Sequence, residues 1–397
     1  MMSVLNDRKR SVVQQSVIES PSSREMRHKA HRICSEFLGG TWAQISPSEM
    51  IFKSVSGGLS NILYCCGLPQ SLQQKFVGST EPHHVLLRLY GQSHSDVLTE
   101  LVIFTLLSER NLGPKLYGIF PEGRLEEYLS ARAVTVEELM KPEISCIIAK
   151  KIANIHSLEV PVVKCPRWLF KTCLDWLVFI EKNVTLDSIM SSTSSKATKR
   201  VAIELLTMFN YRKEIEWLQN IVDMSDSPIV FSHNDLQQGN ILIPEHSRKR
   251  PTLEDRIVFI DFEYCSYNYR GFDIANHFCE WCFDYNDPSY PHFTANSERF
   301  PSIDEQRMFV RQYIHQLKRI NKREKDLVGG KILEELQPFI QASHLLWTLW
   351  AIKNAHTSQI KFGYWEYART RLSFYLDAKK KFVDSRMTVF YENSNRA

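Results

Sequence analysis

Two short apolar runs, each leading into a polar group that can bind metal or accept a proton, constrain this chain most. The first, IVFSHNDLQQGNILI, carries Asp235 and Asn240, and the second, IVFIDFEY, leads into Asp261. Phosphoryl transfer from ATP needs a carboxylate at the attacking hydroxyl and oxygen ligands for a divalent metal on the phosphates. The pattern H-x-D-x₄-N, followed by an acid after a second strand, supplies both. We therefore expect Asp235 to accept or orient the hydroxyl proton, and Asn240 and Asp261 to hold the metal. The alternative is a polar hairpin loop with solvated caps, which is typical of most Asn-Asp pairs.

Composition limits the remaining classes of protein. The chain has 397 residues, 43% of them hydrophobic, enough for one large or two ordinary domains. A net charge of +4 gives no broad basic field, so no nucleic-acid partner is expected. Nine irregularly spaced cysteines indicate reduced thiols in the cytoplasm, and Cys279 and Cys282 are expected to be packing residues of a helix. No apolar targeting segment or membrane span is visible.

The first third of the chain alternates between strand and helix patterns. The polar, Ser-rich residues 1–23 are expected to be a disordered tail. Apolar alternation predicts strands in MIFKSV, NILYCC and HVLLRLY, whereas REMRHKAHRICSEFL and DVLTELVIFTLLSER have helical spacing. We expect residues 24–132 to form a small ATP-binding lobe, a sheet with a helix packed on it.

Beyond residue 133 the apolar residues recur with helical spacing. EISCIIAKKIANIHSL, TCLDWLVFIEKNV, ATKRVAIELLTMFNYRKEIEWLQNIV and three long segments after residue 302 all follow it. Residues 133–385 are therefore expected to form a large catalytic lobe, followed by a C-terminal tail over residues 386–397. The predicted fold class is α+β: a bilobal protein-kinase-like fold with a small mixed-sheet N-terminal lobe and a larger, mainly helical C-terminal lobe.

Two features of the small lobe could bind the phosphates of ATP. Ser56-Gly57-Gly58-Leu59-Ser60-Asn61 lies between two predicted strands, where glycines let the backbone N–H groups approach phosphate oxygens. The alternative is an ordinary turn. The strand HVLLRLY offers Arg88, and the following helix offers Glu100 as its partner. Arginine stands where protein kinases carry lysine, but its guanidinium still binds phosphate through a bidentate fork. The alternative is an arginine exposed at the end of a strand.

Aromatic residues gather near the polar motifs and in the C-terminal helical segments. Trp347 and Trp350 are three positions apart, so they are neighbours on one helical face. Acids accompany the aromatic residues, since Glu263 follows Asp261 and Glu280 lies in NHFCEW. Aromatic faces with a carboxylate form a receptor for a quaternary ammonium, which donates no hydrogen bonds. The alternative, for each ring alone, is a place in the core.

The strings SGGLSNIL, VLLRLYG, LGPKLYGIFPEGRLEEYLSAR, HNDLQQGNIL, IDFEYCSYNYRGFDIANHFCEW and SHLLWTLWAI…FGYWEYA resemble the choline/ethanolamine kinase family, from about residue 28 to about residue 380. The resemblance implies a eukaryotic-protein-kinase-like fold and Mg²⁺-ATP as phosphoryl donor. It further implies phosphorylation of choline at the first step of phosphatidylcholine synthesis, and a homodimer. FGYWEYA is more similar to choline kinases than to the ethanolamine-preferring branch, and ethanolamine is expected as a secondary substrate.

The resemblance also assigns roles to individual residues. Asp235 is the base, with Asn240 and Asp261 completing the catalytic set, and Asn240, Asp261 and Glu263 are the expected metal ligands. The nucleotide site is implied to comprise a phosphate loop, Arg88, a hinge and two further residues: Gly57, Gly58, Leu59, Ser60, Asn61, Ile62, Leu63; Glu126, Glu127, Tyr128, Leu129, Ser130, Ala131, Arg132; Gln237 and Asp261. The choline cage is implied to comprise Tyr264, Glu280, Tyr285, Trp347, Trp350, Phe362 and Tyr367.

One departure from the family keeps alternatives open. The family usually reads HNDxQEGN, whereas Gln238 replaces the acid here. A weakly active or scaffold member of the family is therefore one alternative, and an enzyme that acts mainly on ethanolamine is another. A further alternative is a small-molecule kinase of the same architecture, such as an aminoglycoside or sugar phosphotransferase, whose site would be lined by acids rather than by Trp347 and Trp350.

Overall fold

The computed structural model describes residues 21–55, 61–73, 81–90, 97–192, 194–244, 252–320 and 328–394. The described chain divides into two compact units. The first runs up to Ala133 and includes the later segment Ile241–Asp261; the second comprises Val134–Asn240 and the described residues from Phe262 onward. The predicted boundary at residue 132 lies next to this division. The return of 241–261 to the first unit was not part of the prediction.

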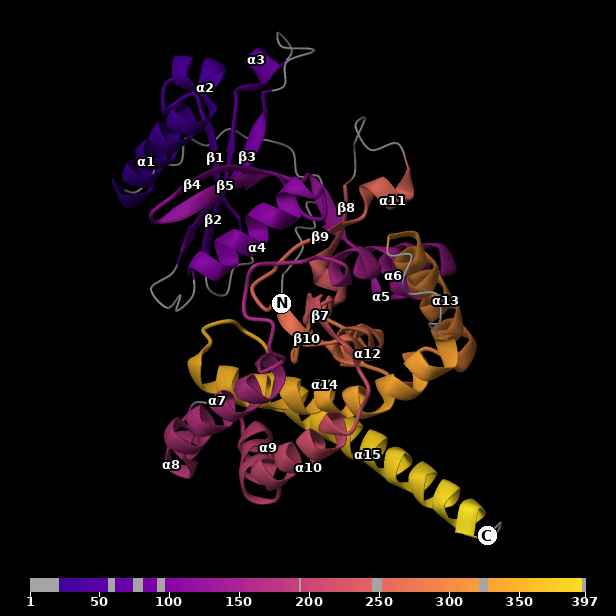
Figure 1. The fold of residues 1–397 in the computed structure, drawn as a ribbon. Helices are drawn as coiled ribbons and strands as arrows, with labels where there is room; N and C mark the ends of the chain where they lie inside the picture. Colours follow the sequence, from indigo (N-terminus) through magenta and orange to yellow (C-terminus); the bar gives the residue numbers. More distant parts are fainter. Residues whose placement is uncertain are drawn as a thin grey trace. The chain divides into compact units, whose positions relative to one another are not determined.

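The first unit is built on an antiparallel sheet with strand order β1-β2-β3-β5-β4. Its strands are β1 (Ile51–Val55), β2 (Asn61–Gly67), β3 (His84–Tyr90), β4 (Leu116–Phe120) and β5 (Gly123–Glu127). A second sheet, ordered β6-β8-β9, joins β6 (Ala131–Ala133), β8 (Ile241–Pro244) and β9 (Val258–Phe259). The helices are α1 (Pro21–Leu38), α2 (Gly40–Gln44), α3 (Gln70–Gln73), α4 (Val97–Glu109) and α11 (Leu253–Arg256). Figure 1 shows α1 beside the five-stranded sheet.

Strict alternation along β3 gives the first unit its core. Val85, Leu87 and Leu89 are buried, and every second residue between them is only half-buried. The buried face packs with Cys34 of α1 and Trp42 of α2 in one apolar cluster. Because side chains of a strand alternate between its two faces, Arg88 lies on the opposite face. The predicted strands in this part of the chain and the helices α1 and α4 are confirmed.

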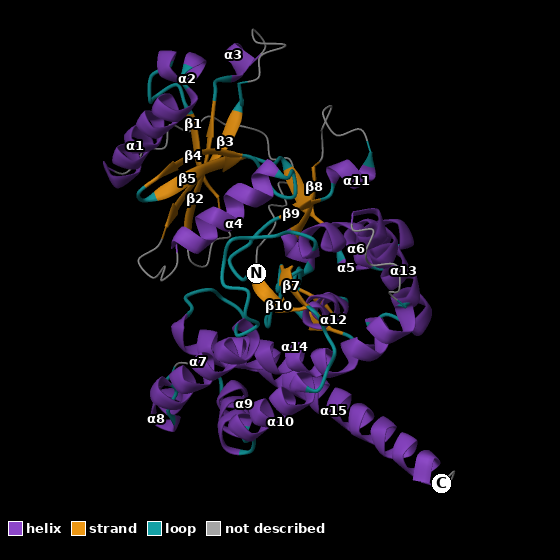
Figure 2. Ribbon diagram, in the orientation of Figure 1, coloured by secondary structure: helices purple, strands orange, loops and turns teal. Residues whose placement is uncertain are grey.

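The second unit is mainly helical, as Figure 2 shows. Its helices are α5 (Val136–Leu139), α6 (Pro142–His156), α7 (Trp168–Asn183), α8 (Leu186–Ser191), α9 (Lys196–Thr207), α10 (Tyr211–Asp223), α12 (Arg270–Glu280), α13 (Ile303–Ile320), α14 (Gly329–Thr357) and α15 (Tyr364–Ser394). Short 3₁₀ turns are η1 (Gln238–Asn240) and η2 (Ser297–Arg299). The strands β7 (Ile229–Ser232) and β10 (Ser266–Tyr269) pair with each other, as do β11 (Phe283–Asp284) and β12 (Thr294–Ala295).

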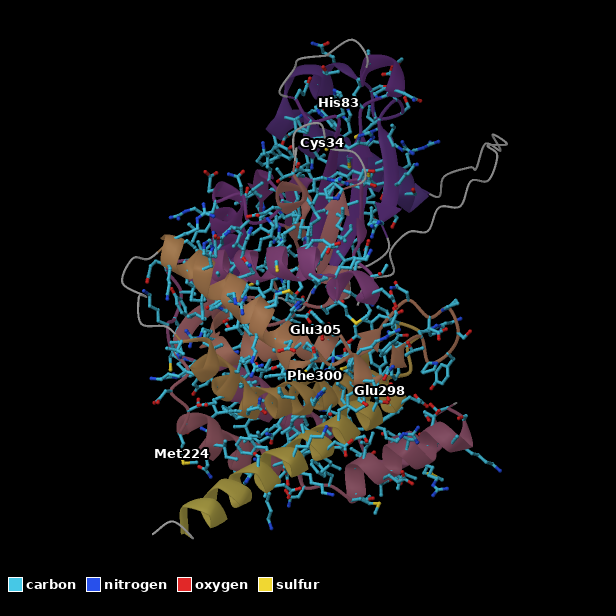
Figure 3. All side chains as sticks on the ribbon, turned by 90° about the vertical axis from the view of Figure 1, so that its right-hand side faces the viewer. Cys34, His83, Met224, Glu298, Phe300 and Glu305 are labelled. Carbon is cyan, nitrogen blue, oxygen red and sulfur yellow. The ribbon has the colours of Figure 1, made fainter. Side chains whose placement is uncertain are left out.

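Helix α14 is the centre of the second unit. Every residue from Gln341 to Ile352 is buried, and the helix packs against α7, α12 and α15. A helix that is buried all round needs neighbours on all sides, which these three supply. Helix α12 is buried along its whole length. Its Phe278 contacts Phe300, labelled in Figure 3, with ring centroids 6.4 Å apart.

The structure refines three of the segment predictions. The segment with helical spacing over residues 197–222 forms two helices, α9 and α10, and the Asn210 side chain caps α10 by accepting a hydrogen bond from Lys213 N at 3.1 Å. The expected C-terminal tail from residue 386 is helical as far as Ser394. Of the N-terminal tail, residues 1–20 lie outside the described residues, and Pro21 already begins α1.

Within the described residues, no helix has both the length and the apolar character required to cross a bilayer. Cys279 and Cys282 are buried and unbridged, as expected of packing cysteines.

Candidate active site

The loop that follows β7 is held by its own backbone. His233 and Asn234 are fully buried, and Asn234 has φ of 68°, a left-handed conformation that is uncommon outside glycine. Their two N–H groups donate to the two carboxylate oxygens of Asp273, at 2.9 and 2.8 Å. Asn268 donates to the Asn234 side-chain oxygen at 2.8 Å. The loop is therefore fixed in one conformation before any ligand arrives.

Asp273, in the first turn of α12, is the residue on which this loop depends. His156 Nε2 lies 2.9 Å from its Oδ2, and Tyr313 OH lies 2.8 Å from the other ring nitrogen of His156. Burial raises the pKa of a carboxyl group, but His156 and the N–H of His233 together hold the pKa of Asp273 below its ordinary value. Asp273 therefore stays ionised and keeps both backbone groups paired.

Asp235 and Asn240 lie together, as the sequence predicted. Asn240 Nδ2 donates to Asp235 O at 2.8 Å and to Asp235 Oδ2 at 3.0 Å. Asp235 is half-buried among fully buried neighbours. The other end of the amide, Asn240 Oδ1, is buried and accepts no hydrogen bond within the described part of the chain. A buried carbonyl oxygen without a donor costs about 1–3 kcal/mol unless a ligand uses it.

The Asn240 Oδ1 atom, which is buried and accepts no hydrogen bond in the described chain, is consistent with the expected metal site. Amide and carboxylate oxygens are the ligands that Mg²⁺ prefers. Asp261, just beyond β9, is half-buried and has φ of 65°. Glu263 is exposed to solvent. Among the described residues, no three His, Cys, Asp or Glu side chains gather into a metal-binding group. Asn240, Asp261 and Glu263 stay metal ligands predicted from the sequence.

The two glutamines of the loop have different partners. Gln237 Oε1 accepts a hydrogen bond from Gly239 N at 2.6 Å, so its amide closes the turn into η1. Gln238 is buried and donates from Nε2 to Asp284 Oδ1 at 3.3 Å. The residue that departs from the family pattern therefore leaves the Asp235–Asn240 contact intact.

Two further residues of α12 hold the loop, and sequence reasoning missed both. Asn276 Nδ2 donates to Asn234 O at 3.5 Å, and its Oδ1 accepts from Trp347 Nε1 at 2.7 Å. His277 Nδ1 lies 3.0 Å from Leu236 O, while burial lowers the pKa of His277 to about 4. The signal was present in GFDIANHFCE, where polar residues occupy a segment that is buried on every side.

The predicted cage aromatics form one connected cluster in the second unit. Ring centroids are 5.9 Å apart for Tyr264 and Trp347, 5.7 Å for Trp347 and Trp350, and 6.3 Å for Trp350 and Tyr367. Tyr367 continues the cluster to Phe362 at 5.6 Å and to Tyr285 at 6.0 Å. Segments separated by about a hundred residues thus bring the six predicted rings together.

Glu280 does not face the cluster as a bare carboxylate. It is 2% exposed and forms an ion pair with Arg371, which is fully buried. Tyr285 OH donates to Glu280 Oε2 at 2.7 Å. The expectation of a carboxylate opposing a bound cation therefore needs correction, because Arg371, missed in the sequence, already balances the charge.

The cation of the small sheet has a different partner from the one expected. Arg88 Nε donates to Glu126 Oε1 at 2.7 Å, and Arg124 donates to both Glu126 and Glu100, at 2.7 and 2.8 Å. Arg88 and Arg124 are directly opposite each other on β3 and β5, on the same face. The strands come close here, since a Cβ on Gly123 would lie 2.0 Å from Arg88 O.

The remaining nucleotide-site predictions fall on and around β2, β5 and β6. Gly57, Gly58, Leu59 and Ser60 lie outside the described residues, whereas Asn61 begins β2, with Ile62 exposed and Leu63 buried. Glu126 and Glu127 end β5, and residues 128–130 lead to β6, which contains Ala131 and Arg132. The Glu126 carboxylate forms ion pairs with both Arg88 and Arg124, so it helps to hold the Arg88 guanidinium in place.

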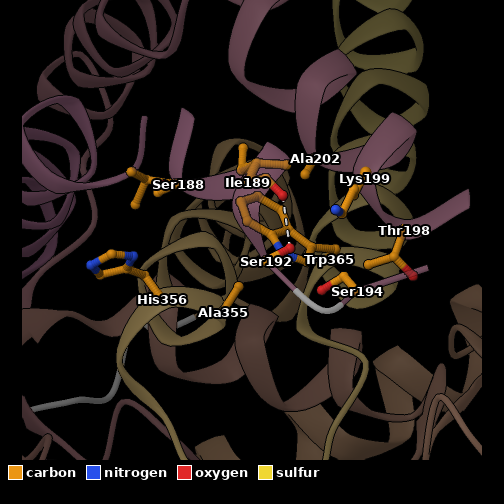
Figure 4. A pocket seen from close by; sticks show the side chains of 11 residues that line it. Ser188, Ile189, Ser192, Ser194, Thr198, Lys199, Ala202, Ala355, His356 and Trp365 are labelled. Atoms are coloured by element: carbon orange, nitrogen blue, oxygen red, sulfur yellow. Dashed lines mark hydrogen bonds between the residues drawn. The ribbon is translucent and has the colours of Figure 1, made fainter. Parts of the chain in front are cut away.

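A cavity of about 230 Å³ lies elsewhere in the second unit, at α8, α9 and the junction of α14 and α15 (Figure 4). None of the predicted site residues lines it. Two of its hydroxyl groups are bound within the chain, since Ser192 donates to Ile189 O and Thr198 donates to Glu366.

Comparison with solved structures defines the structural class of the protein. The crystal structure of choline kinase from Cryptosporidium parvum matches this structure with a TM-score of 0.71 and 26% identity, over 90% of this chain and 96% of that one. Fold and loop together define a phosphotransferase of protein-kinase-like α+β fold, as predicted.

The family model described as choline/ethanolamine kinase matches residues 52–376. The chain is 40% identical to the rat protein named choline/ethanolamine kinase, over 91% of this chain and 88% of that protein. It is 39% identical to mouse choline kinase alpha, over 91% and 83% of the two chains. The chain belongs to the choline/ethanolamine kinase family.

Proposed function

We propose that the protein transfers the γ-phosphoryl group of ATP to the hydroxyl of choline, with ethanolamine as a secondary substrate. The product, phosphocholine, would enter phosphatidylcholine synthesis. The observation that carries the proposal is the hydrogen-bonded path from the loop of Asp235 to the aromatic cluster. Asn234 donates to Tyr264 O at 2.8 Å, and Asn276 joins Asn234 to Trp347. A phosphorylation site and a quaternary-ammonium receptor are thereby built on one rigid support.

Asp235 acts on the substrate hydroxyl. Its carboxylate accepts or orients the hydroxyl proton as the oxygen attacks phosphorus, which is the role of the loop aspartate in this chemistry. Asn240 holds Asp235 Oδ2 at 3.0 Å and so restricts the direction of the carboxylate. Asp273 keeps the preceding backbone fixed, so little reorganisation remains for the reaction itself.

The proposed metal is Mg²⁺, which when bound supplies positive charge against the phosphate oxygens. Asn240 Oδ1 and Asp261 would hold it. Glu263 is exposed and would contribute less directly. In the first unit, Arg88 would bind phosphate oxygens, residues 57–63 would cover the phosphates, and residues 126–132 would bind the rest of the nucleotide. Gln237, the remaining nucleotide residue predicted from the sequence, belongs to the second unit.

The aromatic cluster supports choline over substrates with several hydroxyls or amines. A cation over a desolvated ring contributes about 0.5–2 kcal/mol per ring. Trp347 and Trp350 supply the two largest rings and are 5% and 8% exposed. A polyhydroxylated substrate would instead require the acid-rich lining that this cluster lacks. A cytoplasmic location and a homodimer remain predictions from the sequence.

The test is a coupled assay that follows ADP release with choline, ethanolamine and several sugars side by side. The wild-type protein should turn over choline fastest, and excess EDTA should abolish turnover until Mg²⁺ is restored. Preferred turnover of a sugar, or full activity in EDTA, would contradict the proposal.

Asp235→Asn tests the chemical step directly. Loss of the carboxylate should lower kcat by at least about 100-fold, the lower range for general-base catalysis, with a small effect on the KM for choline. Asp304→Asn is the matched control, because the Asp304 side chain is 87% exposed at the start of α13. Near-normal kcat in Asp235→Asn would remove Asp235 from the mechanism.

A further inference from the structure

Behind the aromatic cluster lies a closed network of polar groups centred on Arg371. Its guanidinium binds Glu280, donates from Nε to Tyr367 OH at 2.8 Å, and lies 3.2 Å from Tyr285 OH. The two tyrosine hydroxyls are 2.9 Å apart, and Tyr285 OH donates to the second oxygen of Glu280. The guanidinium carbon also lies 3.8 Å from the ring centroid of Phe283. Every polar group of this network has a partner inside the protein.

The network is inaccessible as well as internally paired. Arg371, Glu280 and Tyr367 are 0%, 2% and 3% exposed. Burial, and next the neighbouring Glu280 carboxylate, raise the pKa of Tyr285 above its ordinary value, so its hydroxyl keeps its proton. The carboxylate oxygens of Glu280 and the hydroxyl oxygens of Tyr285 and Tyr367 are therefore bound by Arg371 or by one another, which leaves the faces of the rings, and not these oxygens, for a ligand.

We propose that Arg371 is a positioning residue that sets substrate specificity, because it withholds the oxygen acceptors of Glu280, Tyr285 and Tyr367 from the substrate ammonium. This inference rests on the proposed function and assigns to Arg371 the specificity of the site among alcohols that differ in the methylation of their ammonium group. A trimethylated ammonium has no N–H group and loses nothing in such a pocket. A primary ammonium has three N–H donors that would leave water without new acceptors, a strong basis for rejection.

Arg371→Met tests the inference, because it releases the Glu280 carboxylate and both hydroxyls while keeping much of the side-chain volume. The readout is kcat/KM for ethanolamine, N-methylethanolamine, N,N-dimethylethanolamine and choline, with kcat and KM resolved. For the wild type, kcat/KM should rise with each methyl group. In the variant, the ratio of choline to ethanolamine should fall by at least about tenfold, mainly through a lower KM for ethanolamine.

The double variant Arg371→Met/Glu280→Gln is the control. It removes the buried ion pair without leaving an unpaired carboxylate, a replacement that proteins often tolerate. Its choline-to-ethanolamine ratio should lie closer to that of the wild type than the ratio of the single variant. If both variants lose kcat/KM equally on all four substrates, with the ratio within about twofold of wild type, Arg371 has only a structural role and the inference is overturned.

Arg371→Lys covers the case in which Arg371→Met fails to fold. Lysine keeps the charge, but it lacks the planar fork by which the guanidinium binds Glu280 and reaches both tyrosine hydroxyls. The ratio should move in the same direction by a smaller factor, and an unchanged ratio would overturn the inference. Calorimetry gives the dissociation constants of choline and ethanolamine for the wild type and the variants, and so tests the role of Arg371 separately from the proposed phosphorylation of choline. If the wild type phosphorylates none of the four alcohols, the proposed function fails, whereas the ratio of the two dissociation constants still tests Arg371.

Discussion

Among single residues, Asp273 supports the loop of Asp235 by binding the backbone of the two residues that precede Asp235. Its two oxygens receive the N–H groups of consecutive residues, His233 and Asn234, and His156 approaches from α6. Few side chains can accept two backbone hydrogen bonds and a third from a histidine, since this takes the several lone pairs of a carboxylate. The geometry of Asp235 thus depends on a residue that does not contact it in the described hydrogen bonds.

Asp273→Asn should destabilise the protein and misplace the loop. The substitution keeps shape but turns one acceptor into an NH₂ group that faces a backbone donor or a histidine. The free energy of unfolding should fall by about 1–3 kcal/mol, the cost of a buried group left unpaired. Urea unfolding measures this cost. A stability equal to that of the exposed control Asp304→Asn would show that the three contacts contribute nothing.

At this scale the sequence predicted the residues that belong to contiguous motifs. Asp235 and Asn240 share a six-residue segment, so their contact follows from local spacing. Helical spacing alone paired Trp347 with Trp350, whereas the full set of cage aromatics followed from the family resemblance. Arg371 and Asp273 could not be derived in this way, since their partners lie 91 and 40 positions away along the chain. The Glu280–Arg371 ion pair shows why a predicted carboxylate can have a different partner from the one assigned.

Among the elements, α12 and α14 approach each other unusually closely at one glycine. A Cβ on Gly271 would lie 2.4 Å from Phe339 Cδ2, and Phe339 is fully buried. The contact also lies beside the loop support, because α12 carries Asp273, Asn276 and His277. A larger residue at this position would separate the helices or displace the ring.

Gly271→Ala should therefore lower the free energy of unfolding by about 1–3 kcal/mol through overpacking. Gly330→Ala is the matched control, because a Cβ there meets nothing within 4 Å and alanine favours a helix. Chemical unfolding of the two variants gives the comparison. Equal stability of both variants would mean that Phe339 yields without cost.

Element prediction from the sequence was accurate where periodicity was long or alternation was strict. β3 alternates along its whole length, and α13, α14 and α15 carry sustained apolar spacing. It was inaccurate at ends and interruptions. The boundary between α9 and α10 depends on Asn210, whose side chain caps α10 by accepting a hydrogen bond from Lys213 N. The apolar spacing of the sequence does not show this hydrogen bond.

For the molecule as a whole, stability should fall in mild acid. His277 is buried and neutral, and its pKa falls from 6.5 to about 4 on folding, mainly because of burial. The unfolded chain therefore binds a proton below pH 6.5 that the folded protein does not bind until about pH 4. Stability is complete above pH 6.5 and should decrease by about 3 kcal/mol as pH falls to 4.

Urea unfolding between pH 7.5 and 4.5 measures this slope. His277→Gln keeps a donor for Leu236 O but does not titrate, so its stability should depend less on pH over the same range. His344, whose pKa burial holds well below its ordinary value, supplies a remaining slope in the same direction. An identical pH dependence in wild type and His277→Gln would contradict the assignment.

The path of the chain has a practical consequence for protein engineering. Strand β6 pairs with β8, and β8 pairs with β9, although residues 134–240 separate the first strand from the other two. A fragment that stops at Ala133 would carry β6 without its partner β8, and a single proteolytic cut cannot release the N-terminal unit intact. Expressing that unit alone would require a short linker from Ala133 to Ile241, spliced so that the three-stranded sheet can still close.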